Sequence, residues 1–343
     1  MDVNVLPNVS VVIVVYNGQK YIKDLLMSLA DQSYPTDKME VLVFDNASTD
    51  NTGLIVKEQF RNVRYINLGK NYGFTGGSNR AFGYAKHDFL AFLNVDTVCH
   101  REWLLSLVSA LVKDNAVGAC CSNVVSMECE EFSDMEKNVP LRNLYGFELT
   151  AFGFAQPIKR QSKSLVCTRL LSGCSFLIRR EVVGELGYLF DEEFWIYAED
   201  TDLSLRIHNL GRKIYAVKDS AVYHIHRSYI KLSANKVRIV AKAIVNRVLA
   251  FYKSMGGFEF ILYFPFLFFG GPLKLFTLSL NPIKKIIYFL PFSLFSMGCM
   301  LSAVFLFPKY ALRRRFILER RKVKAFTILK LMLKSKEIES CHG

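Results

Sequence analysis

Three acidic motifs contain the residues of this sequence that are best suited to chemistry. Asp45 begins the motif D-N-A-S-T-D, Asp96 ends the motif L-N-V-D, and Glu199 and Asp200 lie in Y-A-E-D-T-D. A carboxylate such as Asp45 could accept hydrogen bonds from a ribose hydroxyl or from the N–H of a base. A carboxylate such as Asp96 could hold Mg²⁺ or Mn²⁺, because such hard ions prefer oxygen ligands and share them with phosphates. Clustered acids such as Glu199 and Asp200 raise the pKa of one member, which prepares a general base.

Each motif also has a purely structural interpretation that the sequence leaves open. Ser48 and the residues after it are good N-caps for a following helix. Asn94 and Asp96 have the spacing of an Asx turn. Acids at the start of a helix, such as Glu199, complement the helix dipole without any catalytic role. The positions of these residues in the fold decide between the structural and the functional interpretations.

A glycine-rich segment and a histidine complete the set of candidate residues. The segment contains Asn71, Gly73 and Gly77, and its glycines allow a ligand to approach the backbone just before a predicted helix. It matches neither a phosphate loop nor a dinucleotide fingerprint, so a flexible turn fits it equally well. His224 follows a predicted strand and fits either a structural role or a contact with a metal or a diphosphate.

The elements that must position these residues alternate between short β-branched runs and amphipathic segments. Strands separated by helices of this length indicate β-α-β units and a parallel sheet with helices on its faces. In such a sheet, ligands bind beyond the carboxyl ends of the strands, where Asp45 and Asp96 would lie. The sequence predicts strands at residues 9–15, 41–44, 63–67, 89–93 and 117–121, and helices at residues 19–31, 52–60, 76–86 and 101–115.

Regular periodicity fails after these elements. Residues 126–164 contain a cluster of acids between Glu128 and Glu136 and predict a mobile acidic loop. Order returns at residues 170–178 and at a helix over residues 201–209, which Gly211 ends.

The composition favours a membrane-attached protein. The 343 residues exceed the usual domain size of about 100–200, so we expect two domains or one large domain with an appendage. Lys and Arg (44) outnumber Asp and Glu (31), and the net charge of +13 favours a polyanionic partner. The basic residues cluster beside aromatic-rich, apolar segments, which favours membrane lipid over nucleic acid. The eight cysteines lack C-x-x-C spacing, so we expect reduced, mostly buried thiols.

The character of the chain changes near residue 230. Residues 231–253 are basic and amphipathic, residues 258–280 are aromatic-rich, and residues 286–307 carry no charge. As a helix kinked at Pro291, the last segment would measure about 33 Å, against about 30 Å for the hydrocarbon core of a bilayer. A buried core helix, a membrane-spanning hairpin and helices in the membrane plane all stay open. The N-terminus lacks the basic start of a signal peptide, so we expect the chain to begin in the cytoplasm.

Taken in order, six motifs resemble the inverting nucleotide-sugar glycosyltransferases of family 2, and most closely their rhamnosyltransferase-like subgroup. Besides the three acidic motifs they are V-S-V-V-I-V-V-Y-N from Val9, N-Y-G-F-T-G-G-S-N from Asn71 and S-G-C-S-F-L-I-R-R-E from Ser172. The resemblance implies an α/β GT-A fold over residues 1–230, Rossmann-like, with a mostly parallel sheet and flanking helices. A basic, apolar region of membrane-associated helices would follow over residues 231–343.

The resemblance also implies a role for each candidate residue. Asp200 would be the general base, and Glu199 would orient the acceptor or Asp200. Asp96 and His224 would contact a divalent metal, Mg²⁺ or Mn²⁺, at the donor diphosphate. The donor itself would be bound by Tyr16, Asn17, Asp45, Asn71, Gly73, Gly77 and Asn94.

Two departures from the family pattern concern the metal site. Asn94 stands where many relatives have Asp, so the family's D-x-D motif is incomplete, although many members of the subgroup share this Asn. An amide is a neutral ligand and a weaker one than a carboxylate. His226 and Arg227, between His224 and the matching Ser228, stand where relatives usually include a glycine and would add positive potential near the diphosphate.

These features predict a metal-dependent inverting glycosyltransferase that acts on a hydroxyl of a glycan or lipid-linked acceptor. The subgroup suggests rhamnosyl transfer in the synthesis of a cell-surface polysaccharide. The alternative is a non-catalytic membrane scaffold that binds nucleotide sugars, which would keep Asp45 and lack a working pair of Asp96 and Asp200. A dinucleotide oxidoreductase fits less well, because the first strand runs into Tyr16 and Asn17 rather than a glycine fingerprint.

Overall fold

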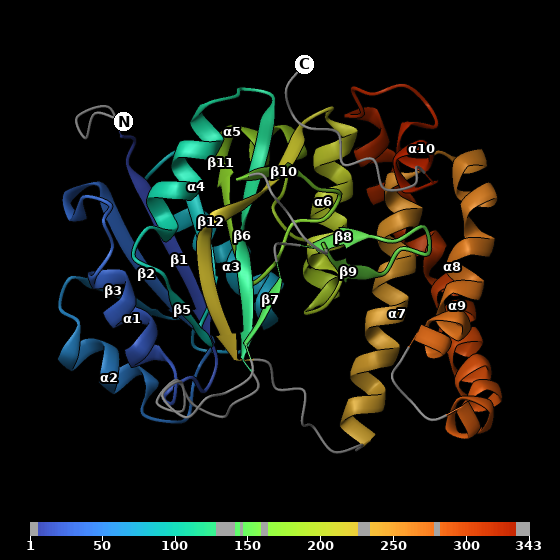
Figure 1. Cartoon of the computed structure of the whole chain (residues 1–343), viewed down its shortest axis with the longest axis horizontal. Helices are drawn as coiled ribbons and strands as arrows, with labels where there is room; N and C mark the ends of the chain where they lie inside the picture. The colour runs from blue at the N-terminus through green and yellow to red at the C-terminus, as the bar shows by residue number, and fades with distance from the viewer. Residues whose placement is uncertain are drawn as a thin grey trace.

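One central sheet runs through the N-terminal part of the chain (Figure 1). The computed structural model describes residues 6–127, 141–144, 147–158, 164–225, 234–277 and 282–333. The strands of the central sheet are β1 (Val9–Val15), β2 (Met39–Asp45), β3 (Val63–Asn67), β4 (Phe89–Asn94), β5 (Thr97–Cys99), β6 (Val117–Met127), β7 (Leu141–Leu144), β10 (Leu165–Cys167), β11 (Ser175–Arg179) and β12 (Lys213–Ile225).

The sheet is mixed, with the order β10-β12-β6-β11-β4-β1-β2-β3. Strands β4, β1, β2 and β3 are parallel neighbours, so their carboxyl ends form one edge: Val15 pairs with Asp45, and Val14 pairs with Asn94. Strand β11 runs antiparallel between β4 and β6, and β12 returns parallel to β6. The predicted parallel arrangement therefore holds for the strands that carry Asp45 and Asn94.

Helices cover both faces of the sheet because its strands alternate their apolar side chains between two buried layers. In β1, Val11 and Ile13 belong to one layer and Val12 to the other, and all three are fully buried. The helices α1 (Ile22–Ala30), α2 (Thr52–Gln59) and α4 (Trp103–Val112) contribute to the first layer, and α3 (Gly73–Tyr84), α5 (Arg180–Leu186) and α6 (Glu199–Asn209) to the second.

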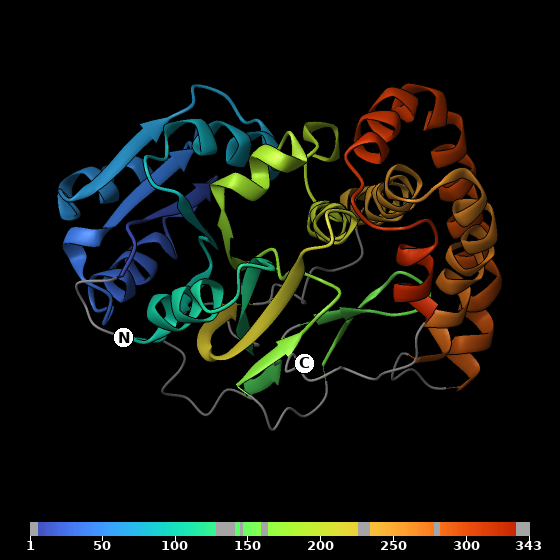
Figure 2. The same ribbon diagram turned by 90° about the horizontal axis from the view of Figure 1, so that it is seen from above.

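The C-terminal helices pack against this α/β part and share a core with it (Figures 1 and 2). They are α7 (Ala234–Ser254), α8 (Gly257–Thr277), α9 (Pro282–Glu319) and α10 (Thr327–Leu333). Phe251 of α7 and Met300 of α9 lie in one apolar cluster with Phe194 and Leu205 of the α/β part. The predicted boundary near residue 230 lies outside the described residues.

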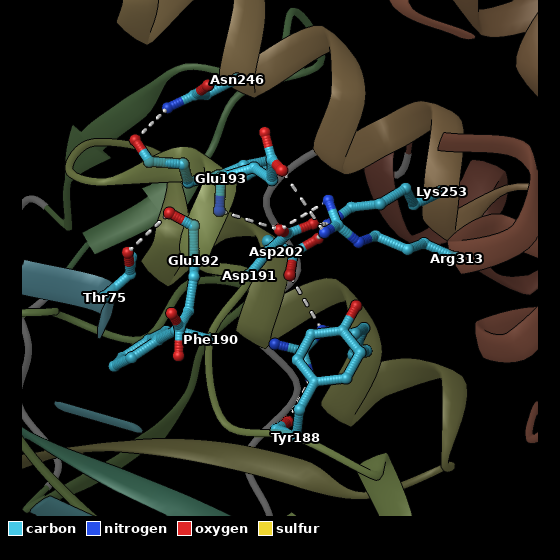
Figure 3. Close-up of polar contacts among 12 residues, drawn as sticks. Thr75, Tyr188, Phe190, Asp191, Glu192, Glu193, Asp202, Asn246, Lys253 and Arg313 are labelled. Atoms are coloured by element: carbon cyan, nitrogen blue, oxygen red, sulfur yellow. Dashed lines mark hydrogen bonds and ion pairs between the residues drawn. The ribbon is translucent and has the colours of Figure 1, made fainter. Parts of the chain in front are cut away.

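A buried ionic cluster also joins the two parts (Figure 3). The Lys253 ammonium of α7 is fully buried and lies 2.7 Å from an Asp191 oxygen and 2.8 Å from an Asp202 oxygen. Arg206 pairs with Asp202 at 2.9 Å, and Arg313 of α9 pairs with Asp191 at 3.0 Å. Burial alone would lower the pKa of Lys253, but the two carboxylates raise it, so the lysine stays charged. Because unpaired charges are so costly to bury, these contacts fix α7 and α9 against the α/β part.

Several elements differ from the sequence-based expectations. Helix α3 begins at Gly73 rather than at residue 76, β6 continues to Met127, and His224 lies inside β12 instead of after a strand. Helix α9 continues through Pro291 and Pro308. Local patterns misplace these ends because tertiary pairing, such as that of β6 with β12, extends a strand beyond its apolar run.

The mobile acidic loop predicted at residues 126–164 is wrong for the described part of that segment. Residues 128–140, with their acids, and residues 159–163 lie outside the described ranges. The rest contains β7 and a hairpin of β8 (Phe147–Leu149) and β9 (Ala155–Pro157). Leu149 is fully buried, and Gly153 lies so close to Phe251 of α7 that a Cβ there would be 2.7 Å from its ring. The hairpin is ordered by its contacts with the C-terminal helices, which local periodicity does not reveal.

Candidate active site

The loops after β1 and β2 are tied together at the carboxyl edge of the sheet. The N–H of Asn17 donates to the Ser48 hydroxyl at 2.8 Å, and the Asn17 side-chain oxygen accepts from the N–H of Thr49 at 2.8 Å. Asn17 has a left-handed backbone (φ 52°), which turns the chain after β1. Ser48 thus links the two loops, while the Asp50 carboxylate accepts from the first N–H of α2. Tyr16, next to Asn17, is half exposed at this edge.

Asp45 is held between a turn and a tyrosine. Its carboxylate accepts from the N–H of Ser48 at 2.7 Å and from the Tyr65 hydroxyl at 2.6 Å, and its side chain is almost fully buried. Burial and the negative charge of Asp45 together raise the pKa of Tyr65, so Tyr65 stays a donor. Asp45 thus closes a turn, and each of its carboxylate oxygens can still accept a second hydrogen bond.

The glycine-rich segment is fixed to β2 by Asn46, a residue that the sequence analysis did not select. The Asn46 amide donates to the carbonyl of Gly73 at 3.0 Å and accepts from the N–H of Tyr72 at 3.3 Å. Asn71 accepts from the N–H of Gly73 at 2.8 Å. Gly77 has no room for a side chain, because a Cβ would be 2.6 Å from Val14 of β1. This glycine brings α3 close to the sheet.

Asp96 and His224 meet at the same edge. Strand β12 crosses to pair with β5, which places His224 opposite Thr97 and its Nε2 atom 3.2 Å from an Asp96 oxygen. Two ligands of one octahedral ion lie about 3 Å apart, so this spacing fits a shared divalent metal. Among the described residues, no three His, Cys, Asp or Glu side chains form a metal cluster. His226, Arg227 and Ser228 lie outside the described ranges.

Glu199 and Asp200 form the first turn of α6. Burial raises the pKa of both carboxyl groups, and the charge of Asp200 further raises that of Glu199. Asp200 accepts from the N–H of Thr201 at 2.6 Å, whereas one buried oxygen of Glu199 has no hydrogen-bond partner among the described residues. Because its charge is better supported, Asp200 ionises first and Glu199 keeps its proton. A carboxylate next to a neutral carboxylic acid is suited to accept a proton.

Gly173 and Cys174 bring the two acidic regions together. Gly173 lies directly against the acids: a Cβ there would be in van der Waals contact with the Cβ of Asp200, at 3.4 Å. The Cys174 carbonyl accepts from the N–H of Asn94 at 2.9 Å. Burial raises the pKa of the Cys174 thiol to about 12, and the charges of Asp96 and Asp200 act in the same direction. Asp96 and Asp200 therefore face one region of the fold.

The glycine-rich segment contacts this region through Gly73. A Cβ at Gly73, which has a φ of 71°, would lie 2.6 Å from the ring of Trp195, a few residues before Asp200. The N–H of Thr75 donates to the Trp195 carbonyl at 3.2 Å. Asp45, its neighbour Asn46, Gly73 and Trp195 thus form a continuous series of contacts along the carboxyl edge toward Glu199 and Asp200. Gly173 and Cys174 belong to the motif from Ser172, but their residue types alone predict no role at the site.

The family of the chain follows from comparison with known proteins. The family described as glycosyl transferase family 2 matches residues 10–187, just over half of the chain, so the chain belongs to this family. It is 27% identical over 217 residues to the probable glycosyltransferase YdaM of Bacillus subtilis, a match that covers 61% of this chain and 48% of YdaM. The chain thus spans about half the length of that relative.

Solved structures share the fold. GalNAc-T7 with UDP, GalNAc and Mn²⁺ has a TM-score of 0.62 at 19% identity, covering 83% of this chain and 54% of that one. A mannosyltransferase of Pyrobaculum calidifontis with GDP-Man and Mn²⁺ has a TM-score of 0.55 at 18% identity, covering 97% and 89%. The predicted GT-A fold with flanking helices is confirmed, and its sheet is mixed rather than mostly parallel.

Proposed function

We propose that the chain transfers a sugar from a nucleotide-diphosphate donor to a hydroxyl group, with inversion at the anomeric carbon. The observation that carries this proposal is the buried pair of Glu199 and Asp200 beside Gly173, on the same side of the fold as Asp96. The similar structures that contain UDP or GDP-Man support a nucleotide sugar as donor. Among sugars, the resemblance to the rhamnosyltransferase-like subgroup favours rhamnose.

The donor would lie along the carboxyl edge of β1 and β2. Tyr16 and Asn17 at the end of β1, and Asp45 at the end of β2, would contact the nucleoside. Asn71 and Gly73 would approach the ribose through the loop that Asn46 fixes. Asn94 and Asp96 would face the diphosphate.

Asp200 would act on the acceptor. Its carboxylate would take the proton of the acceptor hydroxyl as that oxygen forms a bond to the anomeric carbon. The bond from this carbon to the diphosphate oxygen breaks on the opposite face, so the configuration inverts. Glu199, which keeps its proton, would donate a hydrogen bond to the acceptor or to Asp200.

A divalent metal fits Asp96 and His224. When bound, it would neutralise charge that develops on the leaving diphosphate. Similar structures that contain Mn²⁺ support Mn²⁺ as the ion. A nitrogen ligand such as His224 also favours Mn²⁺ over Mg²⁺, because Mg²⁺ binds almost entirely through oxygen.

We further propose that the outer apolar face of α8 and α9 lies in the plane of a membrane. Helix α9 is long and apolar enough to cross a bilayer, but its inner face packs on α7 through Met300 and Ala303. Its C-terminal half forms ion pairs with the α/β part through Lys309 and Arg313. A helix fixed along the catalytic part in this way is better suited to lie on the membrane than to span it. The outer apolar face consists of Phe258, Ile261, Leu262, Phe266 and Phe269 of α8 and Leu290, Leu294, Leu301, Phe305 and Leu312 of α9.

This arrangement would hold the catalytic part at the cytoplasmic surface of the membrane. Arg315, which is exposed shortly after Leu312 of the outer apolar face, would contact anionic headgroups. A glycan or lipid-linked acceptor presented at that surface would then reach Asp200.

Replacing Asp200 tests the proposed chemistry. Asp200→Asn keeps the size of the side chain but removes the base, so we expect transfer to fall by about 100- to 10,000-fold. Donor affinity should stay within about twofold, because the residues proposed to bind the nucleoside are unchanged. Transfer is measured as the nucleotide released when an extract of glycan and lipid-linked acceptors is present. Donor affinity is measured by calorimetry. Asp219→Asn, at an exposed position of β12, is the control; near-normal turnover by Asp200→Asn would remove Asp200 from this role.

Removing the imidazole tests the metal site. We expect a chelator to abolish transfer, and we expect added Mn²⁺ to restore it better than Mg²⁺. The variant His224→Gln should bind Mn²⁺ about tenfold more weakly or worse. Binding is measured from the loss of the free Mn²⁺ signal in electron paramagnetic resonance, with nucleotide diphosphate present. His100→Gln changes an exposed histidine on the loop after β5 and serves as the control. Equal Mn²⁺ binding by both variants would contradict the assignment.

Polar substitutions on α9 test membrane attachment. Leu301, Phe305 and Leu312 are 52%, 84% and 79% exposed, so changing all three to Gln should leave the fold intact. We expect the variant to lose flotation with vesicles of phosphatidylglycerol, because buried apolar area drives such binding. The control changes Met27 and Leu54, exposed on α1 and α2, to Gln. Unchanged flotation of the α9 variant would contradict this membrane face.

A further inference from the structure

The segment that leads into the catalytic pair has an unusual backbone. Trp195, Tyr197 and Ala198 have φ values of 62°, 70° and 62°, in the left-handed region that residues other than glycine rarely adopt. Glu199 and Asp200 follow directly. Such conformations persist only where the surroundings hold them, and they cluster at functional sites.

One side chain of α7 holds this segment. The amide nitrogen of Asn246 lies 3.0 Å from the carbonyl oxygen of Phe194, 3.2 Å from that of Ile196 and 3.0 Å from that of Tyr197. Asn246 is only 3% exposed. Figure 3 shows it on its helix, directed at the segment that follows Glu193. An amide NH₂ group has two hydrogens, so these carbonyls share both donors.

The opposite side of the segment faces the donor loop. The Trp195 carbonyl accepts from the N–H of Thr75, and the Trp195 ring fills the space beside Gly73. The segment is therefore held between α7 and the start of α3. Its side chains point outward: Trp195 and Tyr197 are each 42% exposed.

We propose that Asn246 is a positioning residue for glycosyl transfer: by holding these carbonyls, it sets the strained segment and hence the direction of Asp200. The proposal rests on the proposed function of Asp200. It makes α7, which lies beyond the residues that match the family, part of the active site. A small displacement of a catalytic group is costly, because a shift of about 1 Å can reduce the rate about 100-fold.

A purely stabilising asparagine would behave differently, and the chain offers a matched control. Asn209 is also buried, at 2% exposed, and its amide donates to the carbonyl of Ser254 at 2.9 Å. It therefore has the same chemistry as Asn246 without touching the strained segment. Asn209→Ala should cost stability and leave the site unchanged.

The test compares Asn246→Ala with Asn209→Ala in the full chain. We expect both variants to lose thermal stability, and only Asn246→Ala to reduce kcat, by roughly 10- to 100-fold. The donor KM of Asn246→Ala should change much less than kcat, because Ser48 and Tyr65, rather than Asn246, hold the Asp45 carboxylate. Asn246→Ser keeps one hydrogen-bond donor, so it should retain part of the activity that Asn246→Ala loses. It replaces the alanine variant in the test if that variant does not fold.

Tryptophan fluorescence gives a second readout that does not need activity. The chain has two Trp residues, and Trp103 is fully buried, so Trp103→Phe leaves Trp195 as the reporter. We expect Asn246→Ala to increase quenching of Trp195 by acrylamide, and Asn209→Ala to leave it unchanged. Equal kcat and equal quenching for the two variants would overturn the proposal. If the unaltered chain transfers no sugar, the proposed function fails. In that case the quenching of Trp195 still tests the positioning role, and equal quenching with and without Asn246→Ala would overturn it.

Discussion

The burial of two adjacent carboxyl groups at the start of α6 is the constraint on which the site depends. Glu199 is buried and Asp200 is partly buried, so the pair does not readily carry two charges. The hydrogen bonds from Thr201 favour the charge on Asp200. The surrounding fold is consistent with this requirement. Gly173 lies against the acids, and Asn246 holds the segment that leads into them.

The central sheet makes the arrangement possible because parallel strands end at one edge. Asp45 ends β2, whereas Asn94 ends β4 and Asp96 follows it two residues later. The register of β1 with β2 and β4 brings these two strand ends to that edge. The sequence could predict this much, since apolar runs followed by acids mark strand ends. It also predicted that Asp96 and His224 share a site, and their side chains are in contact. Their roles in catalysis remain predictions.

Other parts of the site could not be predicted because they depend on contacts between distant residues. Asn46 looks like an ordinary loop residue until its amide is seen to fix Gly73, and Asn246 looks like a polar position on a basic helix. The apolar character of α9 was evident in the sequence, but which face is covered depends on its packing with α7. The β8–β9 hairpin was missed for the same reason, because its order comes from the C-terminal helices.

The pH dependence of kcat/KM for the unaltered chain tests the central claim most directly. Asp200 must be ionised to accept a proton, and burial raises its pKa, so the rate should fall with acidification well above pH 3.9, the approximate value for an ordinary aspartate. Glu199→Gln should leave the position of this fall unchanged, because Glu199 is already neutral. A rate that stays constant down to the ordinary aspartate range, or a fall that moves in Glu199→Gln, would contradict the account.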